Sequence, residues 1–323
     1  MHYATSINVA GTKSFRLSTS KLLGYYGGNA QNPPPELCKC IVPSGPNRSF
    51  VQPDQSGAES LVVAMEAGNG LYRRILEAGI KQHSYFALHI FIDEFRGNSP
   101  KYTYWKRDPF ELAALPQWPG LNKAIKNSGS RYDLGKMGNH ARSYKMKWPT
   151  FQLKVLADTE GKVVLSNDES KHILNTWDEL FPEVIDWQNL TEHQLRTTRT
   201  LRNLFGFPRT FYGRMNDALI REAISWIPQS TVGCITHFAV IALQKYIETH
   251  NKDWFILNNK HDSFLVDCPD KDIEDCCAAA RNAIEMDLTS TKGEKFKMKS
   301  GVSVGKNWGK YHPEDNPCGM KEL

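Results

Sequence analysis

The chain has 323 residues, of which 40% are hydrophobic and 23% charged, a composition typical of a globular protein with one large or two moderate domains. The net charge of +5 is a mild basic excess, which is compatible with a polyanionic partner and does not identify one. The sequence shows neither an apolar run approaching roughly 18 residues nor a basic-then-apolar leader, so we expect no membrane partner and a cytoplasmic location. Seven scattered cysteines are expected to be reduced.

In chain order, residues 49–54 form a strand-like stretch that ends at Asp54. Residues 150–166 are expected to form a hairpin with its turn at residues 158–161. The apolar periodicity predicts helices over residues 60–78, 82–95, 131–145, 168–181, 191–205, 216–250 and 271–288, and strands over residues 207–214 and 296–304. Strands near both ends with helices between them predict an α+β fold, a sheet domain interrupted by a helical subdomain.

Two carboxylates stand out in this arrangement. The apolar runs 254–257 and 264–266 flank a short polar centre, which predicts a β-hairpin with Asp262 near its turn. Asp54 lies at the end of another strand. If the two strands meet, these acids form a hard oxygen site for magnesium, and a metal pair suits phosphoryl displacement. The alternatives, a charged tip on a surface hairpin and an acid that caps the next helix, remain open at this point.

The helix at residues 131–145 carries a second signal. Tyr132, Lys136, His140 and Tyr144 follow one another at intervals of four and therefore share one helical face. Lysine binds phosphate as a point charge, and aromatic rings stack on a base or a sugar. A basic, solvated helix has a similar composition, but here aromatic side chains fill the stripe.

Seven stretches form an ordered set of short motifs. They are residues 11–19 (GTKSFRLST), 29–33 (NAQNP), 54–59 (DQSGAE), 136–144 (spaced Lys and Tyr), 228–232 (PQSTV), 260–263 (KHDS) and 301–309 (GVSVGKNWG). In this order they resemble motifs of family A DNA polymerases, the group of bacterial DNA polymerase I and many phage replicative enzymes, in which the fourth stretch belongs to the fingers O helix and the sixth usually reads VHDE. The resemblance covers nearly the whole chain.

The resemblance implies a right-hand polymerase with a palm made of residues 1–70 and 206–323. A mostly helical fingers subdomain, residues 71–205, is inserted between these two parts, with its O helix at about 131–145. The implied reaction is attack of a primer 3′-hydroxyl on the α-phosphate of a dNTP, with pyrophosphate leaving. The implied partners are primer-template DNA and dNTPs. The implied cofactor is a pair of Mg²⁺ ions, with Mn²⁺ as a substitute.

The resemblance also implies roles for single residues. Asp54 and Asp262 would hold the metal ions, assisted by the carbonyl of Gln55, and Lys136 would bind the triphosphate. The implied nucleotide contacts are Gln55, Ser56, Glu59, His83, Tyr132, Lys136, His140 and Tyr144, with Glu59 excluding the 2′-hydroxyl and His83 touching the β-phosphate. The implied DNA contacts are Arg16, Asn29, Gln31, Asn32, Arg221, Gln229 and His261.

Four positions depart from the family pattern. Tyr132 stands where the family has a phosphate-binding Arg, and His140 stands where it has Phe or Tyr. Gln55 and Ser225 replace a Tyr and an Asn. None of these changes removes an implied metal ligand, so we expect activity to survive.

The chain begins almost directly before the Arg16 motif, so we expect it to lack thumb and exonuclease domains. The hypothesis is a split polymerase of bacteriophage origin, located in the host cytoplasm, with thumb and exonuclease on a separate polypeptide. A polymerase that works alone is the simpler alternative. Two rival functions are a phage-type single-subunit RNA polymerase, which Glu59 argues against, and a non-catalytic DNA-binding subunit, which the intact Asp54, Asp262 and Lys136 argue against.

Overall fold

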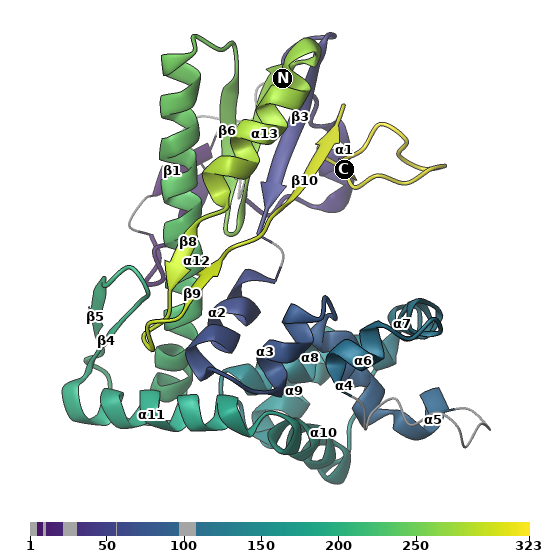
Figure 1. Cartoon of the computed structure of the whole chain (residues 1–323), viewed down its shortest axis with the longest axis vertical. Coiled ribbons are helices and arrows are strands. Elements are labelled where there is room, and N and C mark those ends of the chain that lie inside the picture. Colours follow the sequence, from purple (N-terminus) through teal and green to yellow (C-terminus); the bar gives the residue numbers. More distant parts are fainter. Residues whose placement is uncertain (1–4, 9–10, 22–30, 56, 97–107) are drawn as a thin grey trace. The chain divides into compact units, whose positions relative to one another are not determined.

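The computed structural model describes residues 5–8, 11–21, 31–55, 57–96 and 108–323 (Figure 1). Two predicted site residues, Asn29 and Ser56, lie outside this part of the chain. The chain divides into two compact units. Unit 1 comprises residues 1–59, 203–207 and 226–323, and unit 2 comprises residues 60–202 and 208–225. The palm and fingers boundaries expected after residues 70 and 205 stay a prediction.

Unit 1 is built on an antiparallel sheet with the strand order β11-β10-β3-β7-β6. Its strands are β3 (Arg48–Asp54), β6 (Phe255–Lys260), β7 (Ser263–Pro269), β10 (Gly301–Gly305) and β11 (Lys321–Glu322). The unit also contains α1 (Pro35–Cys40), η2 (Asp270–Asp272), α13 (Ile273–Ile284) and the strand pairs β1 (Thr5–Asn8) with β2 (Ser18–Lys21) and β8 (Asp287–Thr289) with β9 (Lys295–Lys297). This sheet with its helices confirms the α+β prediction.

The central strand of the sheet is β3, which pairs with β10 on one side and β7 on the other. Helix α13 packs against β3, as Figure 1 shows. A small apolar cluster of Phe50, Leu265 and Trp308 joins β3, β7 and the segment after β10. The two neighbours of β3 therefore hold it from both sides, and its last residue, Asp54, takes a fixed position.

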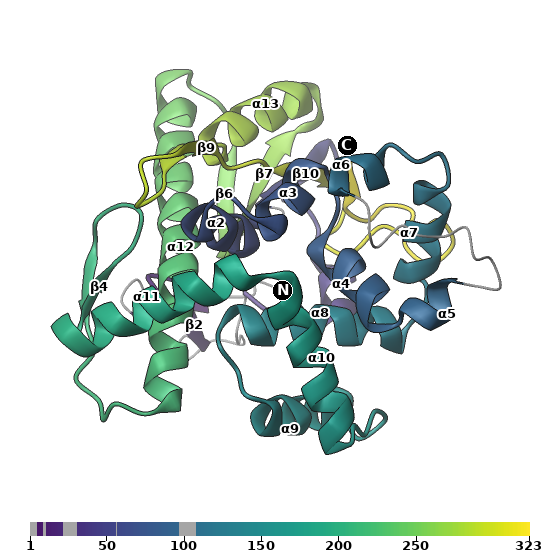
Figure 2. The ribbon, with the colours of Figure 1, turned by 60° about the horizontal axis from the view of Figure 1, so that its bottom comes forward.

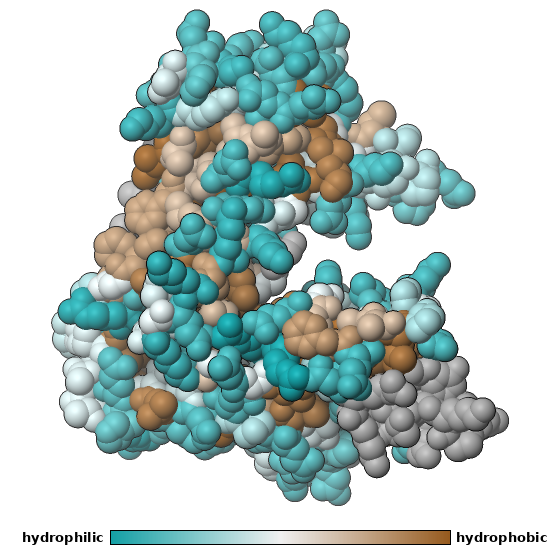
Figure 3. Space-filling model, in the orientation of Figure 1, coloured by the Kyte–Doolittle hydropathy of each residue, from teal (hydrophilic) through white to brown (hydrophobic). Residues whose placement is uncertain are grey.

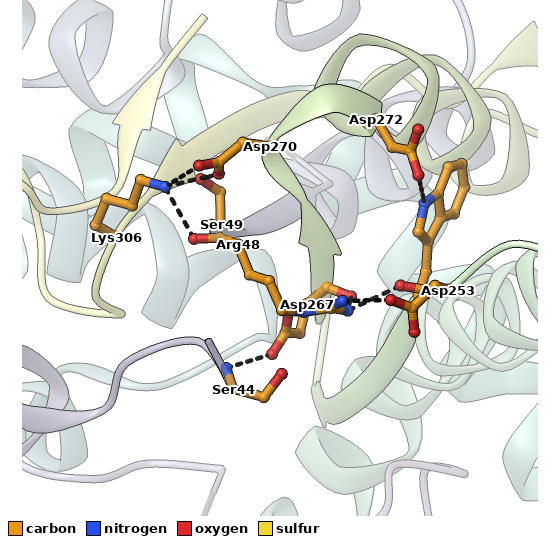
Figure 4. Close-up of polar contacts among 9 residues, drawn as sticks. Ser44, Arg48, Ser49, Asp253, Asp267, Asp270, Asp272 and Lys306 are labelled. Atoms are coloured by element: carbon orange, nitrogen blue, oxygen red, sulfur yellow. Dashed lines mark hydrogen bonds and ion pairs between the residues drawn. The ribbon is translucent and has the colours of Figure 1, made fainter. Parts of the chain in front are cut away.

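A polar network surrounds the start of β3, at Arg48, which is the end of the strand opposite to Asp54 (Figure 4). Arg48 donates from Nε to Asp267 Oδ1 at 2.6 Å and from Nη1 to Asp253 Oδ2 at 2.7 Å. Asp267 is 1% exposed and also accepts from the backbone amide of Ser44 at 2.7 Å. Lys306 contacts Asp270 at 2.6 Å. These charge-assisted contacts connect β3 to β7 at one end and thereby favour a single register along the whole pair.

Unit 2 is mostly helical (Figure 2). Its elements are α3 (Leu71–Glu77), α4 (Gln82–Ile90), α5 (Ile92–Arg96), α6 (Pro109–Ala113), α7 (Trp118–Lys126), α8 (Ser130–Ser143), α9 (Trp148–Asp158), α10 (Asn167–Leu180), α11 (Pro182–Thr198), β4 (Thr200–Arg202) and β5 (Pro208–Thr210). Its core includes Tyr72, Phe86, Trp177 and Phe181, which are fully buried. Helices α4, α8 and α10 pack around these rings.

Two helices, α2 (Ala58–Ala67) and α12 (Asp217–Thr249), contribute residues to both units. Within the described residues, α12 is long and apolar enough to cross a membrane, but 67% of its apolar window is buried inside the protein. The core helix of a soluble protein has the same properties. On the face drawn in Figure 3, apolar residues gather in patches among predominantly polar ones.

Some expectations about secondary structure were wrong, among them those for residues 150–166 and 191–205. Residues 150–166 do not form a hairpin, because residues up to Asp158 belong to helix α9. Phe151 and Val155, one helical turn apart, are both fully buried, and Pro149 stands at the start of the helix, where proline is well tolerated. The helix expected over residues 191–205 ends at Thr198, and strand β4 follows.

Candidate functional site

Asp54 and Asp262 meet at the point where β3 pairs with the β6–β7 hairpin. Asp54 lies opposite Ser263 in the strand register, and Asp262 immediately precedes Ser263. The backbone amide of Gln55 donates to the carbonyl of Asp262 at 3.0 Å. The predicted hairpin is confirmed, with His261 and Asp262 forming the turn between its strands. His261 has a φ of 51°, in the left-handed region that a non-glycine residue rarely adopts.

Burial and charge make these carboxylates unusual. Burial and the neighbouring Asp262 raise the pKa of Asp54 to about 6. Burial also raises the pKa of Asp262, although the positive charge of Arg16 opposes this change. Both carboxylates are therefore held in a setting that disfavours their charged forms, and a bound cation would relieve this penalty.

Several of the predicted DNA contacts gather at the same hairpin. Gln31 is 3% exposed and donates from Nε2 to the carbonyl of Asn259 at 2.8 Å. Asn32 Nδ2 lies 3.4 Å from His261 Nε2. Arg16 forms an ion pair with Glu59. Segments separated by more than two hundred residues in sequence thus converge on the turn that carries Asp262.

A nucleotide contact through the side chain of Gln55 would require that side chain to be accessible, but it is buried. The side chain is 1% exposed, and its Nε2 donates to Thr236 Oγ1 at 2.8 Å. Thr236 Oγ1 in turn lies 3.0 Å from the carbonyl of His261, so this hydroxyl connects α12 to both acidic segments. Thr236 was not predicted, because nothing in the sequence distinguishes one threonine of a long apolar helix.

A cavity of about 540 Å³ borders Asp54. Its lining includes Lys260, the first residue of the KHDS motif, and also Lys310, Lys321 and Glu322, which sequence reasoning did not single out. Strand β11 brings Glu322 opposite Ser303 of β10. The lysines and acids around Asp54 give this cavity mixed charge, which can accommodate both a metal ion and phosphate oxygens.

Unit 2 brings together a second group of predicted residues on α4 and α8. Burial, together with the positive charges of Lys136 and His140, lowers the pKa of His83 to about 4. The rings of His83 and Tyr132 lie 6.5 Å apart, edge to face. Lys136 and His140 are exposed on α8. Together these side chains offer a cation, an imidazole and an aromatic ring on neighbouring helices.

The remaining predicted residues are more dispersed. Tyr144 follows the last residue of α8 and is 8% exposed, with its ring 5.0 Å from that of His140. Arg221 and Gln229 both belong to α12, Arg221 in unit 2 and Gln229 in unit 1, and both are partly exposed. Their predicted DNA contacts stay predictions.

The acidic pair fits magnesium, although within the described residues no group of three His, Cys, Asp or Glu side chains could hold a metal ion. Magnesium in phosphoryl-transfer sites is typically bound by one or two carboxylates together with waters and substrate phosphates. A site with two carboxylates, Asp54 and Asp262, agrees with that chemistry. The backbone carbonyl of Gln55, the third implied ligand, accepts a long hydrogen bond from Ala58 at 3.4 Å.

Residues 139–310, more than half of the chain, match the model of DNA polymerase family A. The chain belongs to DNA polymerase family A. The matched residues of this family A chain include Asp262, whereas Asp54 lies outside the matched range. No curated protein matches the sequence.

The fold of this family A chain is similar to a solved structure described as the POL domain of Pol1 from M. smegmatis in complex with DNA primer-template and dNTP. The TM-score is 0.70 and the sequence identity is 16%. The alignment covers 94% of this chain and 47% of that chain, so this chain spans about half the length of its structural relative. At this identity the likeness concerns the fold.

Proposed function

We propose that this family A chain is a template-directed DNA polymerase that adds deoxynucleotides to a primer 3′-hydroxyl. The observation that carries the proposal is the pairing of β3 with the β6–β7 hairpin, which places Asp54 beside Asp262 in a chain of this family. In the reaction, the 3′-oxygen forms a bond to the α-phosphorus and loses its proton to solvent. The bond from the α-phosphorus to the pyrophosphate oxygen breaks.

Different residues of the chain would bind the metal ions and the triphosphate. Asp54 and Asp262 would hold two magnesium ions, with manganese as a substitute. Such ions, when bound, activate the 3′-hydroxyl and neutralise charge on the phosphates. Lys136 would bind the triphosphate, and His83 would donate a hydrogen bond to it. Catalysis of this type rests mainly on positioning and electrostatic stabilisation.

Glu59 would select deoxynucleotides by occupying the space that a 2′-hydroxyl needs. Its ion pair with Arg16 supports this role, because the pair restrains a side chain that has to stay in place to exclude a substrate. Arg16, Gln31, Asn32 and His261 would line the primer terminus.

The proposal extends to a partner. A thumb and an exonuclease would be supplied by a separate polypeptide, in a split replicative enzyme of phage origin that acts in the host cytoplasm. This part is supported by the motif resemblance. It predicts that a thumb-bearing polypeptide increases the number of nucleotides added per binding event, since phosphate contacts provide much of the affinity for DNA.

Primer extension on a primed DNA template with magnesium tests the proposed activity. Extension by the purified chain is measured with deoxynucleotides and, separately, with ribonucleotides. Each measurement is made with and without candidate partner polypeptides. Extension that requires deoxynucleotides supports the proposal. Efficient extension with ribonucleotides would favour the RNA polymerase alternative. DNA binding with no incorporation under any of these conditions would favour a non-catalytic subunit.

A further inference from the structure

A buried polar network connects α8 to α4 behind the proposed triphosphate contacts. The two helices approach closely at Gly135, where a Cβ atom would lie 2.7 Å from Ala87 Cβ and 2.9 Å from the carbonyl of His83. Because only glycine fits at this contact, the next turn of α8 brings Asn139 alongside His83. Asn139 is 1% exposed, and its amide contacts three other side chains.

The orientation of the Asn139 amide follows from its contact with Trp177. The indole Nε1–H of Trp177 donates to Asn139 Oδ1 at 3.0 Å. An indole nitrogen can only donate, so the amide oxygen has to face Trp177. The amide nitrogen Nδ2 then faces Tyr72 Oη and His83 Nδ1, each at 3.4 Å.

The far end of the network is consistent with this orientation. The Ser143 hydroxyl donates to the backbone carbonyl of Asn139 at 2.7 Å, so its oxygen is left to accept. Tyr72 Oη lies 3.3 Å from Ser143 Oγ and can therefore donate to it. Tyr72 Oη in turn accepts from Asn139 Nδ2. Tyr72 also has a hydrogen-bonding contact with Ser60, and either serine oxygen can accept its hydrogen without changing the donor role of the Asn139 amide nitrogen.

The amide nitrogen of Asn139 has hydrogens and no lone pair to offer, so His83 Nδ1 has to accept from it. We propose that Asn139 is a positioning residue that holds the His83 imidazole in the tautomer protonated at Nε2, so that Nε2–H donates to a phosphate oxygen of the nucleotide. The role of the phosphate rests on the proposed polymerase function, whereas the tautomer follows from the network alone.

The electrostatic setting agrees with this assignment. Burial lowers the pKa of His83 to about 4, so the ring is neutral at physiological pH and has one N–H to place. Lys136 supplies the positive charge, and His83 supplies a directed hydrogen bond. A ring protonated at Nδ1 would turn a lone pair at Nε2 toward the phosphate and repel it.

The tautomer can be measured in the full-length protein by nitrogen NMR of labelled histidine side chains at about pH 8.5, where ordinary imidazoles are neutral. His83→Gln assigns the signal by removing it. His89, on the same helix, is the internal control because its Nδ1 lies 2.9 Å from the carbonyl of Tyr85, which can only accept. We expect the proton on Nε2 in His83 and on Nδ1 in His89. A proton on Nδ1 of His83 in the wild-type protein would overturn the proposal.

A double-mutant cycle separates positioning from a general effect on folding. Asn139→Leu should weaken dNTP binding about tenfold in the presence of His83, as expected for loss of one hydrogen bond to a charged group. In a His83→Ala background the same substitution should change binding little. An equal loss in both backgrounds would overturn the proposal, because Asn139 would then act on the fold as a whole.

Thermal unfolding establishes that each variant is folded. If Asn139→Leu does not fold, the proposal is tested instead by the His83 tautomer, measured in the wild-type protein and in Trp177→Phe. Removing the indole donor should release the amide and give a mixture of His83 tautomers, whereas an unchanged single tautomer would contradict the network. Failure of the polymerase proposal would appear separately, as absence of primer extension by wild-type protein whose His83 proton is on Nε2.

Discussion

The backbone amide of Gln55 donates a hydrogen bond to the backbone carbonyl of Asp262 at 3.0 Å. This contact joins the two acidic segments through main-chain atoms, next to the register pair of Asp54 with Ser263. The position of the two carboxylates therefore does not depend on either carboxylate itself. Substitutions of these acids should change the chemistry of the site and leave the strand pairing in place.

Magnesium binding should depend on pH through Asp54. The pKa of Asp54, about 6, lies above the ordinary value, so the metal-free folded protein binds a proton at Asp54 more tightly than the unfolded chain does. The contribution of this raised pKa to the free energy of unfolding is fully present below the unfolded pKa near 4 and is lost as the pH rises through about 6. Magnesium competes with this proton, so its affinity should rise up to about pH 6 and then level off. Calorimetric titration between pH 5 and 8 checks this.

Asp54→Asn provides the control for that titration. The variant should lose the part of the pH dependence that Asp54 contributes to magnesium binding and to metal-free stability, because its amide does not titrate, and should keep the part due to Asp262, whose pKa is also raised. A wild-type affinity that stays constant from pH 5 to 7 would rule out Asp54 as the titrating ligand.

Glu59→Ala should relax sugar discrimination. The substitution removes the carboxylate proposed to exclude the 2′-hydroxyl, and the ratio of deoxy- to ribonucleotide incorporation should fall on the order of tenfold or more. It also leaves Arg16 without its ionic partner Glu59. Glu59→Gln is the matched control, since it keeps the volume and removes the charge. If both variants discriminate like the wild type in single-nucleotide incorporation, Glu59 is not the gate.

Arg48→Met should destabilise unit 1. Asp267 is 1% exposed and would lose its main charged partner, and an unpaired buried charge costs about 3–5 kcal/mol. Urea unfolding measures this loss. Arg73→Met is the control, because Arg73 pairs with Glu77 on the surface of α3 and such pairs contribute about 1 kcal/mol or less. Equal losses for the two variants would contradict a structural role for the network in Figure 4.

Gly135→Ala should separate α8 from α4. The new methyl group would meet Ala87 Cβ at 2.7 Å and the His83 carbonyl at 2.9 Å, so overpacking of about 1–3 kcal/mol should exceed the gain of about 1 kcal/mol in helix propensity. Gly120→Ala in α7 is the control, because no atom beyond its chain neighbours and the backbone of its own helix lies within 4 Å of its added Cβ. Thermal unfolding should show a loss for Gly135→Ala and no loss for Gly120→Ala.

Local features of the fold could be predicted from the sequence. The β6–β7 hairpin follows from two apolar runs around a short polar turn, and α8 follows from its periodicity. The hairpin expected over residues 150–166 failed because its apolar residues suit either structure, and the burial of Phe151 and Val155 on one helical face decided for α9. Long-range packing outweighed local preference there.

The candidate site could be predicted only in part. Motif resemblance suggested that Asp54 and Asp262 belong together, but periodicity alone does not reveal that β3 pairs with β7. Lys310 and Lys321 were missed because they follow the last motif. Lys321 reaches the cavity beside Asp54 through the pairing of β11 with β10, and Lys310 forms a β-bridge with Met320, just before β11. Asn139 was missed because its role depends on contacts with His83 and Trp177, which lie on other helices.

The rate of single-nucleotide incorporation into a primed DNA template, measured over a range of magnesium concentrations, tests the central claim most directly. We compare the wild-type chain with Asp54→Asn and Asp262→Asn, and we measure DNA binding of each protein in parallel. The account predicts magnesium-dependent incorporation by the wild type and loss of at least about a thousandfold in either variant, with DNA binding largely retained. Incorporation by both variants at the wild-type rate would contradict it.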